Sequence, residues 1–308
     1  MIQILTIIAP LFVIIFVSAL LQKFEKIKEG WSEVLNEFAL KIGLPVLMFS
    51  TLTKVQFSFS TEGKMVIANS IFILISLGIG LIIGKILKLD KQMYRTLFIC
   101  FVFGNIGYLG IPVLIQIAGE GIIPVASLIT AIYLFWMFSV GIGYLDYLTG
   151  KDEKTVVKDI VKNIFLNPII IAVILGIIIG SLQIKLPNIL IKSLDMVNLA
   201  VTPIVLIVIG LFIGKSKLGK LTEWLPIFIF SFFTLMILPA GFYLVTKLLG
   251  YSSTQFSSSI IQAAMPLAIT PFALADKYNL DKTFIARSIV LSTILSIISL
   301  PFWISLVT

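Results

Sequence analysis

Two stretches rich in glycine and proline interrupt apolar segments that are long enough to cross a bilayer. Residues 104–112 read Gly-Asn-Ile-Gly-Tyr-Leu-Gly-Ile-Pro, and residues 263–271 read Ala-Ala-Met-Pro-Leu-Ala-Ile-Thr-Pro. Glycine destabilises a helix interior and proline removes a backbone donor, so neither stretch suits a continuous helix. In a membrane, a broken helix survives only inside protein or beside a water-filled cavity. The alternative is purely structural, because Gly and Pro are common in membrane helices.

The chemistry expected at such a break is ion binding. A half-helix that restarts presents free N–H groups and a partial positive charge, which together favour an anion. Proline suits a first helical turn, so we expect the second half-helices to start near Pro112 and Pro271. The half-helices that end at the breaks present carbonyl groups, which suit a cation or a proton donor.

Asn105 is the most suggestive side chain, because an amide can donate a hydrogen bond to a carboxylate. It could instead only satisfy backbone groups that the break sets free. Asp276 with Lys277, and likewise Asp146, are interpreted as interfacial charges, so no proton carrier is evident at mid-membrane. The candidate substrate-binding residues are Asn105, Gly107, Tyr108, Gly110, Pro112, Gln262, Met265, Pro266, Thr270 and Pro271.

Composition excludes several function classes. The 308 residues are 59% hydrophobic and 12% charged, with no His and a single Cys, Cys100. A polytopic membrane protein is therefore expected, and His/Cys metal sites and His-based triads are excluded. No metal, cofactor or enzymatic activity is predicted. The net charge of +8 lies in short loops between apolar runs, where it indicates membrane topology and not nucleic-acid binding.

About 20 apolar residues cross a bilayer, and with that length the sequence predicts an all-α protein with ten spans. Spans 4 and 9 are the two broken ones. The predicted spans are 2–21, 37–52, 65–87, 94–118, 122–145, 160–182, 191–213, 225–248, 256–278 and 284–306.

The charged segment around Lys151–Lys162 divides the chain into halves of five spans. We expect a first repeat at 1–148, a cytoplasmic linker at 149–159 and a second repeat at 160–308. Five is odd, so the second repeat must be inverted, as is common in secondary transporters. Pro45 in span 2 parallels Pro203 in span 7, and Pro112 parallels Pro271.

Lys and Arg concentrate in alternate loops, which places both termini outside an inner (plasma) membrane. The loops predicted to be inside hold Lys23–Lys28, Lys85–Arg95, Lys151–Lys162, Lys215–Lys220 and Lys277–Lys282. Small residues four apart, such as Gly80 with Gly84 and Gly210 with Gly214, predict close helix packing.

The stretch from Asn105 to Pro112 resembles the Asn-x-Gly-x-x-Gly-x-Pro signature of the auxin efflux carrier family. Leu44–Phe49 and Met265-Pro266 resemble that family's second and ninth spans. The resemblance implies a member of the bile acid, arsenite and riboflavin transporter superfamily, and the short loops indicate a prokaryotic one. It also implies ten spans in two inverted repeats, spans 4 and 9 crossing in a moving domain (an elevator mechanism), and a homodimer through spans 2 and 7. The chain lacks the long central loop of many plant members and has Ala264 where they carry a second Asn.

These features predict an exporter of a small organic anion, such as a mono- or dicarboxylate, bound where spans 4 and 9 cross. A sodium-coupled importer of the bile-acid type is the alternative. An intramembrane enzyme would need a nucleophile with a base or paired carboxylates at membrane depth, and none is evident. A channel would need a ring of charged or carbonyl groups. The expected partners are the anion, membrane lipid and a second copy of the chain, with no nucleic acid.

Overall fold

The computed structural model describes every residue except 1, 29, 55–58, 217–218, 221–222 and 253–255, and the side chains of 59–62 are also left undescribed. The described part is helical. Its first half contains α1 (Ile2–Lys23), α2 (Trp31–Phe38), α3 (Leu44–Leu52), α4 (Phe59–Ile86), α5 (Lys91–Cys100), α6 (Ile111–Ala118), α7 (Ile123–Trp136) and α8 (Ile142–Leu148). The second half contains α9 (Glu153–Phe165), α10 (Pro168–Ser181), α11 (Asn188–Lys215), α12 (Leu225–Phe232), α13 (Leu238–Leu248), α14 (Ser257–Ala263), α15 (Thr270–Tyr278) and α16 (Lys282–Val307).

Wide helical turns join several of these pieces into longer helices. The π-turns are η1 (Ala39–Gly43), η2 (Ile106–Gly110), η4 (Met137–Gly141) and η6 (Phe233–Ile237), and η3 (Glu120–Ile122) is a 3-10 turn. Pro45, Pro112 and Pro239 each follow a π-turn, as the second residue of the next helix. Proline has no N–H, and its ring clashes with the carbonyl four residues back. A widened turn accommodates that clash without ending the helix.

Seven helices of the described chain are long and apolar enough to cross a membrane, and α9 with α10 makes an eighth if that pair counts as one span. This supports a polytopic membrane protein. Predicted spans 4 and 9 are not among these helices, because each of the two is interrupted. The axes of α9 and α10 differ by 56°. The bend follows from sequence, because Asn167 caps α10 through its side chain and Pro168 occupies the first turn. The predicted linker at 149–159 therefore already contains the first turns of α9.

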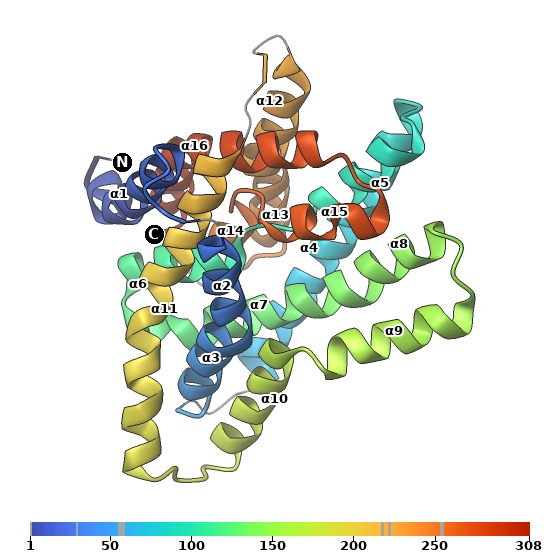
Figure 1. The fold of residues 1–308 in the computed structure, drawn as a ribbon. Helices are drawn as coiled ribbons and strands as arrows, with labels where there is room; N and C mark the ends of the chain where they lie inside the picture. The colour runs from blue at the N-terminus through green and yellow to red at the C-terminus, as the bar shows by residue number, and fades with distance from the viewer. Residues whose placement is uncertain (1, 29, 55–58, 217–218, 221–222, 253–255) are drawn as a thin grey trace.

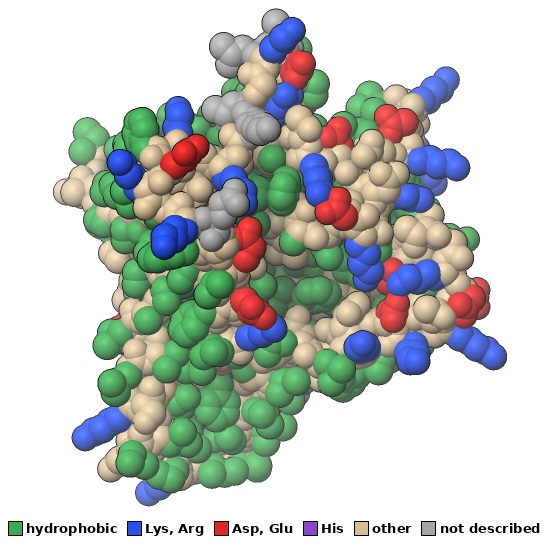
Figure 2. All heavy atoms as spheres, in the orientation of Figure 1, with side chains coloured by type: hydrophobic (Ala, Val, Ile, Leu, Met, Phe, Trp, Pro, Cys, Tyr) green, Lys and Arg blue, Asp and Glu red, His purple; other side chains and the backbone are tan. Residues whose placement is uncertain are grey.

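The arrangement places the interrupted helices in the middle of the molecule. In Figure 1, α11 runs along one edge beside α1 and α2–α3, while α8 and α9 run side by side toward the opposite edge. The helices α14 and α15 lie between these two groups. The largest apolar surfaces in Figure 2 cover α3, α10 and α11, and most Lys and Arg side chains lie at the upper and right margins.

Glycines bring α1 and α11 into backbone contact, as the small-residue pattern predicts. A Cβ on Gly210 would overlap the backbone of Ile15, and one on Gly214 would overlap that of Ala19. Gly80 allows a close contact of the same kind, because its Cβ would lie 3.0 Å from Phe98 Cα in the packing of α4 on α5.

We therefore expect Gly210→Ala to separate α1 from α11 and to lower the free energy of unfolding by about 1–3 kcal/mol. Gly78→Ala is the matched control, because nothing lies within 4 Å of its added Cβ. Alanine is the better helix former, so this control should be neutral or slightly stabilising. Thermal unfolding of both purified variants in the same detergent provides the comparison, and equal unfolding temperatures would contradict the close contact.

Candidate functional site

The two helix breaks lie against each other. The helix α5 ends at Cys100 before η2 begins, and α14 ends at Ala263 before α15 begins. Gly104 and Leu267 form an antiparallel bridge between the breaks. The Asn105 amide donates to the Pro266 carbonyl at 2.7 Å, and the Ala268 amide donates to the Phe103 carbonyl at 2.8 Å. Each break thus satisfies backbone groups of the other, as is required in a medium without water.

The restarted helix of the first break begins earlier than predicted. Asn105 is its N-cap residue, and its carbonyl accepts from the amides of Leu109 (3.2 Å) and Gly110 (2.9 Å). The expected start near Pro112 is therefore wrong, because a π-turn already joins Ile106 to the helix before that proline. The start near Pro271 is confirmed, since this residue occupies the first turn of α15.

Both restarted helices open into one cavity of about 120 Å³. The amides of Ile106, Gly107 and Tyr108 lie in the first turn of η2, ahead of Leu109, whose amide makes the first hydrogen bond of that turn. The Thr270 amide lies in the first turn of α15. Among the residues that the structure describes, no charged side chain lines this cavity, and its wall is mostly apolar. Its polar lining residues are Asn36, Asn105, Tyr108, Thr130 and Thr270, and among its apolar lining residues are Leu44, Leu134, Met137, Ile169 and Ile269. We call it the central cavity.

Asn105 and Tyr108 both line the central cavity and differ in the hydrogen bonds that their side chains make. Asn105 is 4% exposed, and its side chain caps no helix amide, whereas its backbone amide and carbonyl both make hydrogen bonds at the break. The Tyr108 hydroxyl donates to Asn36 Oδ1 at 2.7 Å, which ties the first break to α2. Sequence reasoning missed Asn36. Asn36 lies one residue before the predicted second span (37–52), in the amphipathic helix α2, and its position there gave no signal of a cavity.

The other predicted residues lie elsewhere around the breaks. Gln262 and Met265 line a second cavity, of about 20 Å³, which shares Phe103 and Gly104 with the central cavity. Gly110 packs against both of them, because a Cβ there would lie 3.4 Å from Met265 and 3.6 Å from Gln262. Pro266 contributes its carbonyl to the bridge, and Pro112 and Pro271 are buried in their helices. Of the predicted set, the central cavity brings together Asn105, Gly107, Tyr108 and Thr270.

A wide vestibule of about 640 Å³ leads toward the central cavity and shares Asn36, Ile269 and Ala273 with it. The space-filling view shows a hollow with a hydrophobic floor on this face (Figure 2). The basic residues of its wall are paired as Lys215–Glu33 at 3.6 Å, Lys282–Asp276 at 2.6 Å and Arg287–Glu223 at 2.6 Å. Asp276 thus pairs with Lys282, and the prediction that it pairs with Lys277 is wrong. The Lys277 ammonium lies over the Tyr278 ring.

A buried carboxylate lies near the loop that joins α8 to α9. Asp146, at the end of α8, is fully buried, and Lys151 Nζ lies 2.7 Å from its Oδ1 and 2.6 Å from Asp159 Oδ2 on α9. Hydrogen bonds to these two carboxylates raise the pKa of Lys151. The hydrogen bond from Lys151 lowers the pKa of Asp159. Lys151 therefore links the last turn of α8 to α9.

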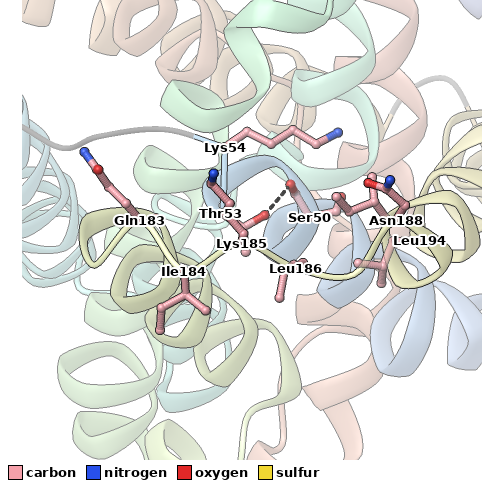
Figure 3. A pocket seen from close by; sticks show the side chains of 11 residues that line it. Ser50, Thr53, Lys54, Gln183, Ile184, Lys185, Leu186, Asn188 and Leu194 are labelled. Carbon is pink, nitrogen blue, oxygen red and sulfur yellow. Dashed lines mark hydrogen bonds between the residues drawn. The ribbon is translucent and has the colours of Figure 1, made fainter.

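A further cavity, of about 470 Å³, lies between the end of α3 and the α10–α11 loop (Figure 3). Gln183 and Lys185 come from the loop, and Asn188 and Leu194 from α11. The Thr53 hydroxyl donates to the Ser50 carbonyl at 2.8 Å, shown by the dashed line. None of the predicted site residues lines this cavity, so we take the central cavity as the candidate site.

Comparison with known proteins agrees with these features. A family model described as "Membrane transport protein" matches residues 3–304. An uncharacterized transporter of Methanocaldococcus jannaschii is 26% identical over 299 residues, covering 94% of this chain and 96% of the relative. An uncharacterized transporter of Methanothermobacter thermautotrophicus is 24% identical over 294 residues, covering 94% of each chain. Both relatives are archaeal, in agreement with the prediction of a prokaryotic member. The chain therefore belongs to the membrane transport protein family, that of the auxin efflux carriers, and is a membrane transporter.

Proposed function

We propose that this transporter is a secondary carrier that exports a small organic anion through the central cavity. The observation that carries the proposal is the convergence of two helix N-termini on a cavity that has no charged side chain. Each terminus supplies about half an elementary positive charge, and the low dielectric strengthens its attraction for an anion. Asn105 adds a donor amide on the same wall.

The apolar wall of the central cavity indicates which class of organic anion fits there. A carboxylate at the two helix N-termini leaves the rest of the ligand against Leu44, Leu134 and Ile169. A second carboxylate there would lose its hydration without gaining a partner, which is costly. We therefore propose that, among the mono- and dicarboxylates, the central cavity favours a monocarboxylate with a small apolar body.

Ligand-induced thermal stabilisation of the purified protein at pH 7 tests this proposal with three four-carbon ligands. Butyrate carries one charge, succinate two and butyramide none. We expect butyrate to stabilise the protein at concentrations at least about tenfold lower than succinate, since a tenfold change corresponds to only about 1.4 kcal/mol. Butyramide should have no effect. Stronger stabilisation by succinate would refute the monocarboxylate preference, and equal stabilisation by butyramide would refute the anion site. Efflux of the preferred ligand from proteoliposomes, compared with its uptake, then tests the direction.

The proposal includes the architecture expected from the resemblance. We infer ten spans in two inverted repeats, with the crossing breaks in a domain that moves as an elevator against spans 1, 2, 6 and 7. The resemblance implies a homodimer through spans 2 and 7, which correspond to α2–α3 and α11. The mass of the protein in nanodiscs tests the dimer. Labelling of an introduced Cys at position 153 with an impermeant reagent tests whether the termini lie outside.

A further inference from the structure

An apolar groove of about 300 Å³ lies between α4 and α13, away from the central cavity. Its lining residues recur at helical spacing, as Ala68, Ile71, Phe72, Ile75 and Ile79 do along α4. Several of the lining side chains are about half exposed, among them Ile71 (51%), Ile75 (54%) and Val245 (50%). The groove therefore opens on the outer surface of the helices. We call it the lateral groove.

Gly241 of α13 lines the lateral groove and keeps it open. In the part of the chain that the structure describes, nothing lies within 4 Å of a Cβ added to this residue. A glycine in a membrane helix usually lets another backbone approach, as Gly210 does for α1. Gly241 has no such neighbour, although glycine weakens a helix relative to alanine. Its missing side chain therefore leaves room for a ligand and not for a second helix.

The lateral groove has the length and polarity that suit one acyl chain. On α4 it extends from Ala68 to Ile79, which is about 16 Å at 1.5 Å per residue. One leaflet of a bilayer has a hydrocarbon depth of about 15 Å. The hydroxyls of Ser76 and Thr246, which line the groove, donate to carbonyls of their own helices and need no ligand. A void there would forfeit dispersion contacts, which a chain of methylene groups restores.

Two lysines lie at one end of the lateral groove. Lys64 Nζ lies 5.5 Å from the centre of the Tyr251 ring, and Tyr251 lines the groove. Lys247 occupies the last turn of α13, between the lining residues Thr246 and Leu249 in the sequence. Among the described residues, neither lysine forms an ion pair with a carboxylate. Basic residues at a membrane surface attract the anionic headgroups of lipids.

We propose that the lateral groove binds one acyl chain of a phospholipid whose anionic headgroup lies at Lys64 and Lys247. The length and apolar lining of the groove select the acyl chain, and the lysines select a negatively charged headgroup. The groove shares Phe72, Ser76 and Leu238 with the second cavity beside the breaks. The bound chain therefore packs on residues that also form the wall of that cavity, and it stabilises the helices next to the breaks.

The experiment measures the thermal unfolding of the purified, delipidated protein in a mild detergent. Dioleoyl phosphatidylglycerol, dioleoyl phosphatidylcholine and glycerol 3-phosphate are added separately at equal concentrations. A ligand that binds only the folded state raises the unfolding temperature. We expect phosphatidylglycerol to raise it by at least about 2 °C more than phosphatidylcholine does. Glycerol 3-phosphate, which has no acyl chain, should have no effect.

Two sets of variants locate the lipid. Gly241→Leu fills the lateral groove and should abolish the difference between the two phospholipids. Gly78→Leu is the matched control, because its added side chain also meets open space but lies outside the groove. Lys64→Gln combined with Lys247→Gln should leave the groove open and remove the preference for phosphatidylglycerol. Lys192→Gln, at an exposed lysine of α11 outside the groove, is the control for that loss of charge and should keep the preference.

Equal stabilisation by the two phospholipids, or by glycerol 3-phosphate alone, would overturn the proposal. An effect of phosphatidylglycerol that persists in Gly241→Leu would also overturn it, because the lipid would then lie elsewhere. A smaller particle mass of Gly241→Leu than of wild type in nanodiscs would identify a second copy of the chain as the occupant and would refute a lipid. If Gly241→Leu does not fold, the paired lysine variant still decides the outcome. No carboxylate ligand is present, so failure here is distinguishable from failure of the anion proposal.

Discussion

Replacing Asn105 with alanine is expected to weaken carboxylate binding by about one to two orders of magnitude while leaving the fold intact. A hydrogen bond to a charged group contributes about 1.5–3 kcal/mol, which corresponds to that loss. The fold should survive because the Asn105 backbone, and not its side chain, bonds to Pro266, Leu109 and Gly110. Titration of the ligand-induced stabilisation of wild type and variant yields the two dissociation constants.

Asn105→Asp tests the same wall by its charge. The side chain at this position is buried and caps no amide, so a carboxylate there is expected to lower the stability of the protein. Its carboxylate would occupy the position where the anion must bind, and binding should be lost. Ala264→Ser is the control in the other break, where the residue is buried but lines neither cavity, and it should bind normally. Wild-type affinity in both Asn105 variants would exclude the anion site at this wall.

The second large effect concerns the buried ion pair at the end of α8. Lys151→Met should leave the Asp146 carboxylate buried and unpaired, at a cost of about 3 kcal/mol, the lower end of the range for such pairs. The lower end applies because the Lys151 side chain is 30% exposed. The unfolding temperature in detergent should fall by about 5–10 °C. In Asp146→Asn combined with Lys151→Met the charge is gone, so most of this loss should be recovered.

Asp159→Asn is the matched control, because its side chain is partly exposed and water replaces the lost partner. It should cause a smaller loss than Lys151→Met. The raised pKa of Lys151 means that its contribution is fully present at neutral pH and is lost only as the pH rises above the ordinary range of lysine. If Lys151→Met and Asp159→Asn had equal effects, the buried carboxylate would not be the cause.

The amino-acid sequence by itself determined the helix breaks, because they depend on local backbone chemistry. Each segment combines at least two glycines or prolines within nine residues, and both segments were predicted to break, whereas the single Pro203 is accommodated inside α11. The start of α15 at Pro271 followed for the same reason. The Asn167-Pro168 pair likewise carries the capping signal that starts α10 at a bend. The resemblance of residues 105–112 to the auxin efflux carriers was confirmed over nearly the whole chain.

Only the tertiary structure decided how the breaks share their backbone groups and which residues face which cavity. At the first break, the helix restarts at Ile106 and not at Pro112, because the Asn105 amide pairs with the distant Pro266 carbonyl. Asn105 and Gln262 were both candidates beside the breaks, yet Asn105 lines the central cavity and Gln262 lines the smaller one. Asn36 reaches the central cavity from a different helix, so no spacing along the chain could indicate it. A helix break depends on the residues within about one helical turn, whereas a binding cavity depends on contacts between residues far apart in the chain.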